Sequence, residues 1–87
     1  MKIKDGFILR DVGGKTFVVA VGKLSKKFQG MITLNETGKI IWSTLTSEAT
    51  REDVINALKK EYDAPIEVIK KDVDTFIAKL TEENILE

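Results

Sequence analysis

The sequence predicts an α+β domain of winged-helix-like form, in which a three-stranded antiparallel sheet at the N-terminal end precedes a three-helix bundle. Two observations lead to this prediction. Runs rich in β-branched and aromatic residues fill the first third of the 87-residue chain, and amphipathic helical patterns fill the remainder. Strands that are grouped before helices favour α+β over a parallel α/β sheet. The length suits one domain, so we expect residues 1–87 to fold as a single unit.

The predicted strands cover residues of about 7–10, 16–21 and 31–34. The first two flank Gly13-Gly14, and paired glycines supply the positive φ angles that a tight hairpin turn needs. The same pair lacks the spacing and the following helix of a phosphate-binding loop, so a turn is the better interpretation.

A loop is expected between Gly22 and Gly30, just before the short third strand. Two of its side chains, Leu24 and Phe28, are expected to fold inward as apolar anchors. Because the third strand follows this long connection, we expect one of its edges to lack a partner strand. An open edge presents unpaired amide and carbonyl groups and can pair with another chain.

The first helix is expected over residues of about 36–45. Asn35 is a good N-cap residue, because its side chain can accept hydrogen bonds from the free amides of a first turn. Gly38 lies inside the helix, where glycine costs about 0.5–1 kcal/mol relative to alanine. We expect close backbone packing, against the third strand, to compensate for that cost. Trp42 has apolar neighbours in the helix and is expected in the core rather than against a ligand.

The second helix is expected over residues of about 51–62, with apolar residues at helical spacing. Thr50 and Asp53 resemble a capping box at its start, with Asp in place of the usual Glu or Gln. Neighbouring carboxylates such as Glu52 and Asp53 do not face one another in a helix. The sequence therefore does not predict a catalytic pair of carboxylates there.

The third helix is expected over residues of about 66–82 and carries a long apolar stripe. Pro65 suits its first position, because the missing amide needs no partner there. The short apolar tail Ile85-Leu86 is expected to pack back on the core as a clasp or an edge strand.

The composition argues against several classes of function. Lys and Arg number 14 and so do Asp and Glu, so the chain lacks the overall basic charge of most nucleic-acid-binding domains. Without cysteine there is no disulfide, thiolate zinc site or thiol nucleophile. Without histidine the chain lacks the commonest general base and the commonest transition-metal ligand. We therefore expect neither catalysis nor a metal or cofactor.

The sequence gives no reason to expect contact with a membrane. No apolar run approaches the ~18 residues of a membrane span, and the first five residues do not open a signal peptide. A cytoplasmic location is the expectation. Zero net charge leaves little repulsion between copies, so a homodimer formed through an open sheet edge stays an alternative.

The segment LNETGKIIWSTL, residues 34–45, is the most informative stretch of the chain. It resembles the signature at the first helix of PqqD-like proteins, also called RiPP recognition elements. Residues 30–34 are similar to the third strand of that family, and residues 72–86 are similar to its third helix and tail. The resemblance spans about residues 5–87. Ser43-Thr44 departs from the pattern, since stronger helix formers are usual at that point.

The resemblance implies a protein that binds ribosomally made precursor peptides. In such proteins the leader segment adds as a strand beside the third strand and lies in a groove against the third helix. A separate modifying enzyme, such as a radical SAM protein, a cyclase or a protease, then acts on the core peptide. The candidate peptide-binding residues are Met31, Ile32, Thr33, Leu34, Ile69, Lys70, Asp72, Val73 and Phe76.

Other interpretations stay open at this point. Apolar residues such as Ile69 and Val73 at helical spacing also fit a plain core, and Lys70 also fits a solvated face. A winged-helix DNA-binding protein would insert the third helix into the major groove, although the acidic residues of that segment would repel phosphates. A structural protein that tethers partner proteins through an exposed face is a further alternative.

Overall fold

The computed structural model describes residues 1–27 and 30–87. Its sheet contains β1 (Phe7–Val12), β2 (Lys15–Ala20) and β3 (Met31–Leu34), all antiparallel and in the order β1-β2-β3. The hairpin turn between β1 and β2 consists of Gly13 and Gly14 alone, whose φ angles are 59° and 80°. Both strands therefore reach closer to the turn than predicted.

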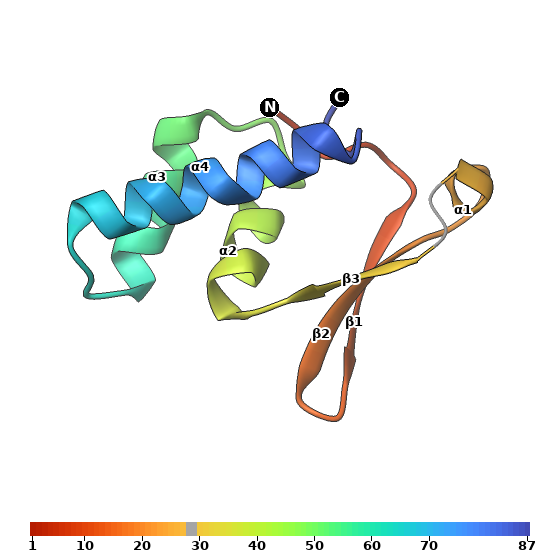
Figure 1. Ribbon diagram of the computed structural model, residues 1–87, viewed down its shortest axis with the longest axis horizontal. Helices are drawn as coiled ribbons and strands as arrows, with labels where there is room; N and C mark the ends of the chain where they lie inside the picture. Colours follow the sequence, from red (N-terminus) through yellow and green to blue (C-terminus); the bar gives the residue numbers. More distant parts are fainter. Residues whose placement is uncertain (28–29) are drawn as a thin grey trace.

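The helices follow the sheet and pack beside it (Figure 1). They are α2 (Glu36–Leu45), α3 (Arg51–Glu61) and α4 (Ile66–Glu82). The predicted fold class, an N-terminal antiparallel sheet followed by helices, is confirmed.

The segment predicted as a loop, residues 22–30, contains a single helical turn, α1 (Leu24–Lys27). Leu24 is half-buried and packs on Gly6, since a Cβ atom added to Gly6 would lie 2.8 Å from Leu24 Cδ1. The contact is with the end of the sheet at Gly6, and the hydrophobic core of the described residues does not include Leu24. Phe28, the second expected anchor, lies outside the described residues.

The expected caps fix where α2 and α3 begin. The Asn35 side chain accepts a hydrogen bond of 2.8 Å from the amide of Gly38. At α3 the amide of Asp53 donates to the Thr50 hydroxyl, and the amide of Thr50 donates to the Asp53 carboxylate. This is the reciprocal pattern of a capping box. α4 begins at Ile66, as predicted, so Pro65 is its N-cap and not its first helical residue.

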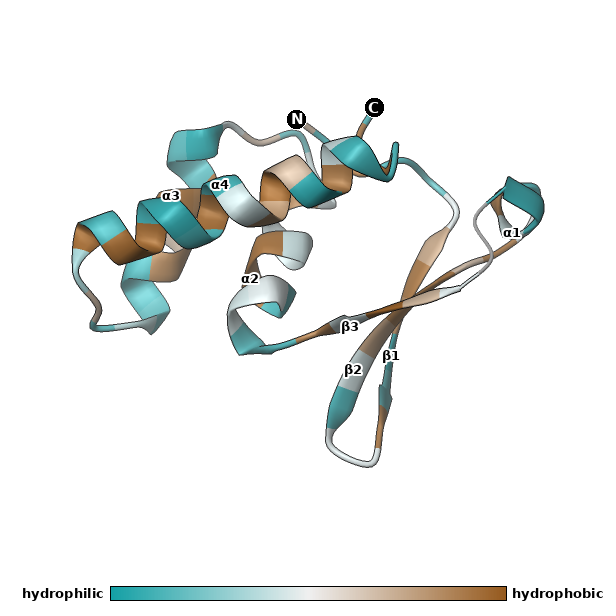
Figure 2. Ribbon diagram, in the orientation of Figure 1, coloured by the Kyte–Doolittle hydropathy of each residue, from teal (hydrophilic) through white to brown (hydrophobic). Residues whose placement is uncertain are grey.

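The core lies between the helices and the inner face of the sheet. Trp42 is 2% exposed and meets the ring of Phe7 edge-on, with 5.8 Å between ring centroids. The expectation of a core tryptophan is confirmed. Figure 2 shows hydrophobic and hydrophilic residues alternating around α4, as expected for a helix with one face in the core.

The two ends of the chain close against each other and against the core (Figure 1). Ile3 forms a β-bridge with Leu86, and the amide of Lys4 donates to the carbonyl of Ile85 at 2.9 Å. Ile85 is fully buried, and the amide of Ile3 donates to the carbonyl of Leu45 at 2.8 Å. The tail therefore acts as the expected clasp.

Gly38 lies where α2 meets both β3 and α4. A Cβ atom at this position would lie 3.1 Å from Phe76 Cε1, 3.1 Å from Asn35 Oδ1 and 3.5 Å from Leu34 Cδ2. The close packing expected for this glycine is therefore present, and it involves α4 as well as the third strand. The absence of a side chain lets the Phe76 ring approach α2.

We expect Gly38→Val to lower the free energy of unfolding by about 1–3 kcal/mol, because the added methyl groups would push on Phe76 and on the Asn35 cap. Gly38→Ala should change it by less than about 1 kcal/mol, since better helix propensity offsets a small shift of the ring. Urea denaturation measures both changes. Ser43→Val, at an exposed position of α2, is the control, since it changes the free energy of unfolding only through the helix propensity of a β-branched residue. A cost for Gly38→Val equal to that of Ser43→Val would contradict the packing role.

Candidate functional site

β3 is an edge strand, and no further strand lies beyond it in the described part of the chain. Antiparallel pairs alternate between hydrogen-bonded and non-hydrogen-bonded residues. The amide of Val21 donates to the carbonyl of Gly6 at 2.7 Å, which fixes the phase of this alternation between β1 and β2. The odd-numbered residues of β2 therefore bond to β1, and its even-numbered residues direct their backbone groups at β3.

The same alternation determines which side of β3 each amide and carbonyl group faces. Ile32 and Leu34 pair in register with the even-numbered residues of β2, so their amides and carbonyls face β2. Met31 and Thr33 consequently direct their amide and carbonyl groups at the open edge. This edge therefore offers two donors and two acceptors to an additional strand.

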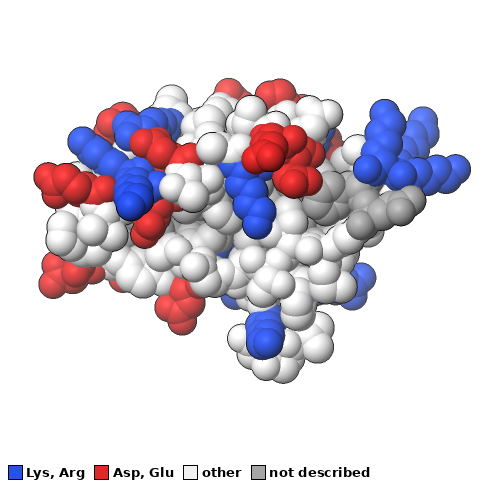
Figure 3. All heavy atoms as spheres, in the orientation of Figure 1, with Lys and Arg blue, Asp and Glu red and all other residues white. Residues whose placement is uncertain are grey.

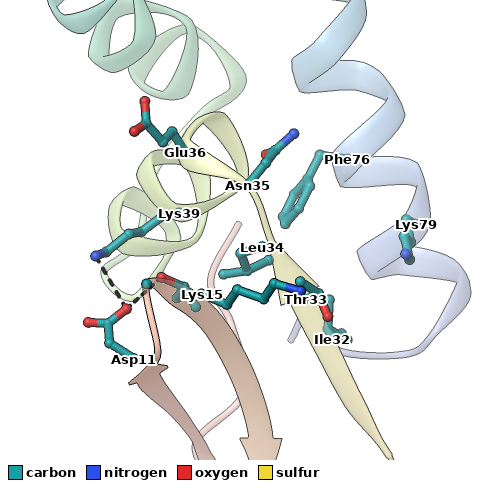
Figure 4. A pocket seen from close by; sticks show the side chains of 12 residues that line it. Asp11, Lys15, Ile32, Thr33, Leu34, Asn35, Glu36, Lys39, Phe76 and Lys79 are labelled. Atoms are coloured by element: carbon teal, nitrogen blue, oxygen red, sulfur yellow. Dashed lines mark hydrogen bonds and ion pairs between the residues drawn. The ribbon is translucent and has the colours of Figure 1, made fainter.

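A hollow of about 810 Å³ lies beside this edge, and Figure 4 shows its side chains. Its walls come from the sheet, from the start of α2 and from α4. The lining residues are Asp11, Gly14, Lys15, Thr16, Ile32, Thr33, Leu34, Asn35, Glu36, Lys39, Phe76 and Lys79.

Two smaller hollows extend this space along β3 and α4. One, of about 520 Å³, lies at the end where Met31 and Glu83 line the space. The other, of about 230 Å³, lies at the opposite end, where Asn35 and Asp72 line the space. Lys79 lines all three hollows. The result is a groove along which β3 and α4 run in opposite directions.

The floor of the groove is apolar. Ile32 and Leu34 point inward from β3 and are 8% and 5% exposed, so only a small part of each side chain meets solvent. Phe76 is half-buried and leans from α4 toward the end of β3 (Figure 4). An apolar side chain on an added strand could be buried against these three residues.

The sequence-predicted site residues divide into two groups. The groove brings together Met31, Ile32, Thr33, Leu34, Asp72 and Phe76. Ile69 and Val73, 4% and 0% exposed, belong to the hydrophobic core and line none of these hollows. Lys70 is exposed on α4 and also lies outside them.

Several groove residues were not predicted from the sequence. Lys79 follows Phe76 by three positions, so helical spacing alone puts both on neighbouring parts of one face. That signal was available for Lys79. Lys15 and Lys39 lie on β2 and α2, and the sequence carries no local signal that these elements meet at the groove.

The acidic groups of the main hollow have partners. The Asp11 carboxylate accepts a hydrogen bond of 2.5 Å from Thr16 and lies 3.6 Å from the Lys39 ammonium. The Thr16 hydroxyl, and then the charge of Lys39, lower the pKa of Asp11 below its ordinary value. The Glu36 carboxylate accepts a hydrogen bond of 3.0 Å from the Tyr62 hydroxyl. Among the described residues, Lys15 and Lys79 have no carboxylate within ion-pair distance.

Charges over the rest of the visible face are mixed (Figure 3). Acidic and basic side chains alternate over the helices, and lysines gather at the α1 end. Within residues 1–27 and 30–87, no group of three or more acidic side chains is arranged to hold a metal ion. No helix of the same residues has the length and apolarity needed to cross a bilayer.

A solved structure and a family model match this chain. No curated protein sequence matches the chain. Among solved structures, TbiB1 in complex with the TbiA(beta) leader peptide superposes with a TM-score of 0.76 at 22% identity, over 100% of this chain and 95% of that one. The family model of coenzyme PQQ synthesis protein D (PqqD) matches residues 8–86, which is nearly the whole chain. The chain therefore belongs to the PqqD family.

Proposed function

We propose that this protein binds the leader segment of a ribosomally made precursor peptide and presents it to a modifying enzyme. The leader adds as a strand beside β3, and its inward side chains enter the groove against α4. The observation that carries the proposal is the open edge at Met31 and Thr33 beside an apolar floor. Strand addition obtains affinity from main-chain bonds and specificity from pockets for alternate side chains.

The family and the fold support this function. TbiB1, which has the same fold, was solved with a leader peptide bound. The peptide-contacting residues of the proposal are Met31 and Thr33 through backbone groups, Ile32, Leu34 and Phe76 through the floor, and Asp72 at one end. Ile69 and Val73 belong to the same buried cluster as Ile32 and Leu34. Residues 1–87 act as one peptide-binding domain, in the cytoplasm, where ribosomal peptides are made.

In this proposal the protein is not itself an enzyme. Chemistry on the core peptide belongs to the partner, for example a radical SAM protein, a cyclase or a protease. The partner must approach the sheet that holds the leader, because the core peptide continues from that added strand. The outer face of the sheet is continuous with the same edge, since Ile8, Val19 and Met31 lie side by side in register across it. Ile8 is 40% exposed and Met31 is 61% exposed. We therefore propose that the modifying enzyme packs on this face.

We expect Ile8→Glu to weaken capture of the modifying enzyme by about tenfold, because a buried apolar contact is replaced by an unpaired charge. Binding of the leader should stay within about twofold of the wild-type value, since Ile8 lies on β1, away from the groove. Surface plasmon resonance with immobilised enzyme measures the first value and calorimetry the second. Val68→Glu, at a 48% exposed position of α4, is the matched control. An equal loss with Val68→Glu would contradict a role specific to the sheet.

The leader-binding function itself is tested by isothermal titration calorimetry. The peptides to be tested are leader segments of small precursor peptides encoded beside the gene, and a scrambled peptide of the same composition is the control for each. The expected result is binding of the true leader at micromolar concentration or tighter, with no heat from the scrambled one. Heat of equal size with both peptides would contradict recognition.

A further inference from the structure

The chemistry of the groove identifies the kind of leader side chain that it selects. The floor formed by Ile32, Leu34 and Phe76 is apolar, and the cations that lack an ion-pair partner, Lys15 and Lys79, stand at its margin. In Figure 4 the Lys15 side chain extends across the hollow toward β3, and Lys79 stands on α4 at the opposite wall. Of the acidic residues of the same hollow, Asp11 meets Lys39 and Glu36 stands on the side of α2, so both lie across the hollow from Lys79.

The acidic residues that share a hollow with Lys79 leave its charge available. Glu83 and Asp72 line the two end hollows, and neither comes within ion-pair distance of Lys79. Glu36 lies at the α2 side of the main hollow and accepts its hydrogen bond from Tyr62. Lys79 lines all three hollows, so a bound peptide that follows the groove must pass it.

The spacing on α4 is shorter than the spacing of a strand, and the length of a lysine side chain covers the difference. Phe76 and Lys79 are three residues apart, which is about 4.5 Å along a helix axis. Residues i and i+2 of a strand point to the same face and are about 6.7 Å apart. The long lysine side chain spans the difference, so alternate inward side chains of an added strand meet Phe76 and Lys79 in turn.

We propose that the leader carries an apolar residue and an acidic residue two positions apart, with the apolar side chain on Leu34 and Phe76 and the carboxylate bound by Lys79, assisted by Lys15. This inference rests on the proposed leader-binding function. It adds a selectivity that the backbone of β3 cannot provide, because main-chain hydrogen bonds form with almost any peptide sequence.

The test uses a displayed library of random 12-residue peptides, selected separately on the wild-type protein, on Lys79→Glu, on Lys79→Gln and on Lys59→Glu. Lys59 is exposed on α3, lines none of the three hollows and matches the change in net charge. Circular dichroism of each variant establishes that it folds, and Lys79→Gln serves if the reversed charge disturbs the end of α4.

The expected wild-type result is enrichment of Asp or Glu two positions from a large apolar residue. Lys59→Glu should retain that preference, Lys79→Gln should lose it, and Lys79→Glu should enrich Lys or Arg instead. In the selected peptides, replacing the acid by Ala should weaken binding to the wild-type protein by about twofold to fivefold. Replacing it should weaken binding to Lys79→Gln by less than it weakens binding to the wild-type protein, since Lys15 alone remains.

Two other outcomes would overturn the inference in distinguishable ways. Peptides enriched for apolar residues without an acidic preference would leave the binding function intact and remove the role of Lys79. No enrichment of any peptide over the naive library would remove the binding function and the inference together.

Discussion

Phe76→Asp is expected to abolish measurable binding of the leader peptide. Phe76 is the half-buried side chain of α4 that closes the groove against the end of β3. Loss of one buried apolar anchor costs roughly 1.5–3 kcal/mol, which corresponds to about 10- to 150-fold in affinity. The aspartate adds the cost of bringing a charge into the contact. Calorimetry at concentrations that saturate the wild-type protein should therefore give no heat.

Controls on the same helix separate lost recognition from lost folding. Val68→Asp puts the same charge on α4 at a 48% exposed position outside the groove and should bind as the wild type does. Phe76→Leu keeps an apolar side chain and should weaken binding by only about tenfold. Thermal unfolding followed by circular dichroism reports the stability of each variant. Wild-type affinity in a folded Phe76→Asp protein would rule out the groove as the binding site.

Thr33→Pro is expected to weaken leader binding by more than tenfold while leaving the sheet intact. The Thr33 amide faces the open edge, so proline removes a donor that the sheet itself does not use. One lost bond costs about 1 kcal/mol, or about fivefold in affinity. The proline ring also occupies space where the backbone of the added strand must lie.

The neighbouring position provides a control of opposite behaviour. Ile32 directs its amide at β2 and is 8% exposed, so Ile32→Pro removes both a hydrogen bond of the sheet and a buried side chain, and should lower stability by about 3 kcal/mol or more. Thr33→Ala keeps the amide, and its leader affinity should stay close to that of the wild type. Urea denaturation and calorimetry on the three variants give the stability and affinity values. Unchanged affinity in Thr33→Pro would mean that the leader does not pair with β3.

Much of the fold can be predicted from local chemistry. Asn35 and the Thr50–Asp53 pair mark helix starts because their side chains satisfy amides only a few residues away. Gly13-Gly14 marks the hairpin because both residues adopt positive φ. The helical turn at Leu24 was not predicted, because its residues carry no apolar stripe and the turn packs on Gly6, distant in sequence.

The site is less predictable because it depends on which elements meet. The order of strands makes β3 an edge, and this could be anticipated from the long connection that precedes it. On α4, helical spacing fits both core and groove, so the sequence could not distinguish Val73 in the core from Phe76 in the groove. The Lys39 contact with Asp11 joins α2 to β1 and leaves no trace in local sequence.

Amide hydrogen exchange of the ¹⁵N-labelled protein, followed by NMR with and without the leader peptide, tests strand addition most directly. The two sheet edges serve as site and control, since Met31 and Thr33 face outward from β3 while Leu9 and Asp11 face outward from β1. Saturation with the leader should slow exchange at Met31 and Thr33 and leave Leu9 and Asp11 unchanged. Slowing at Leu9 and Asp11 instead, or no slowing at Met31 and Thr33 in a saturated complex, would contradict pairing of the leader with β3.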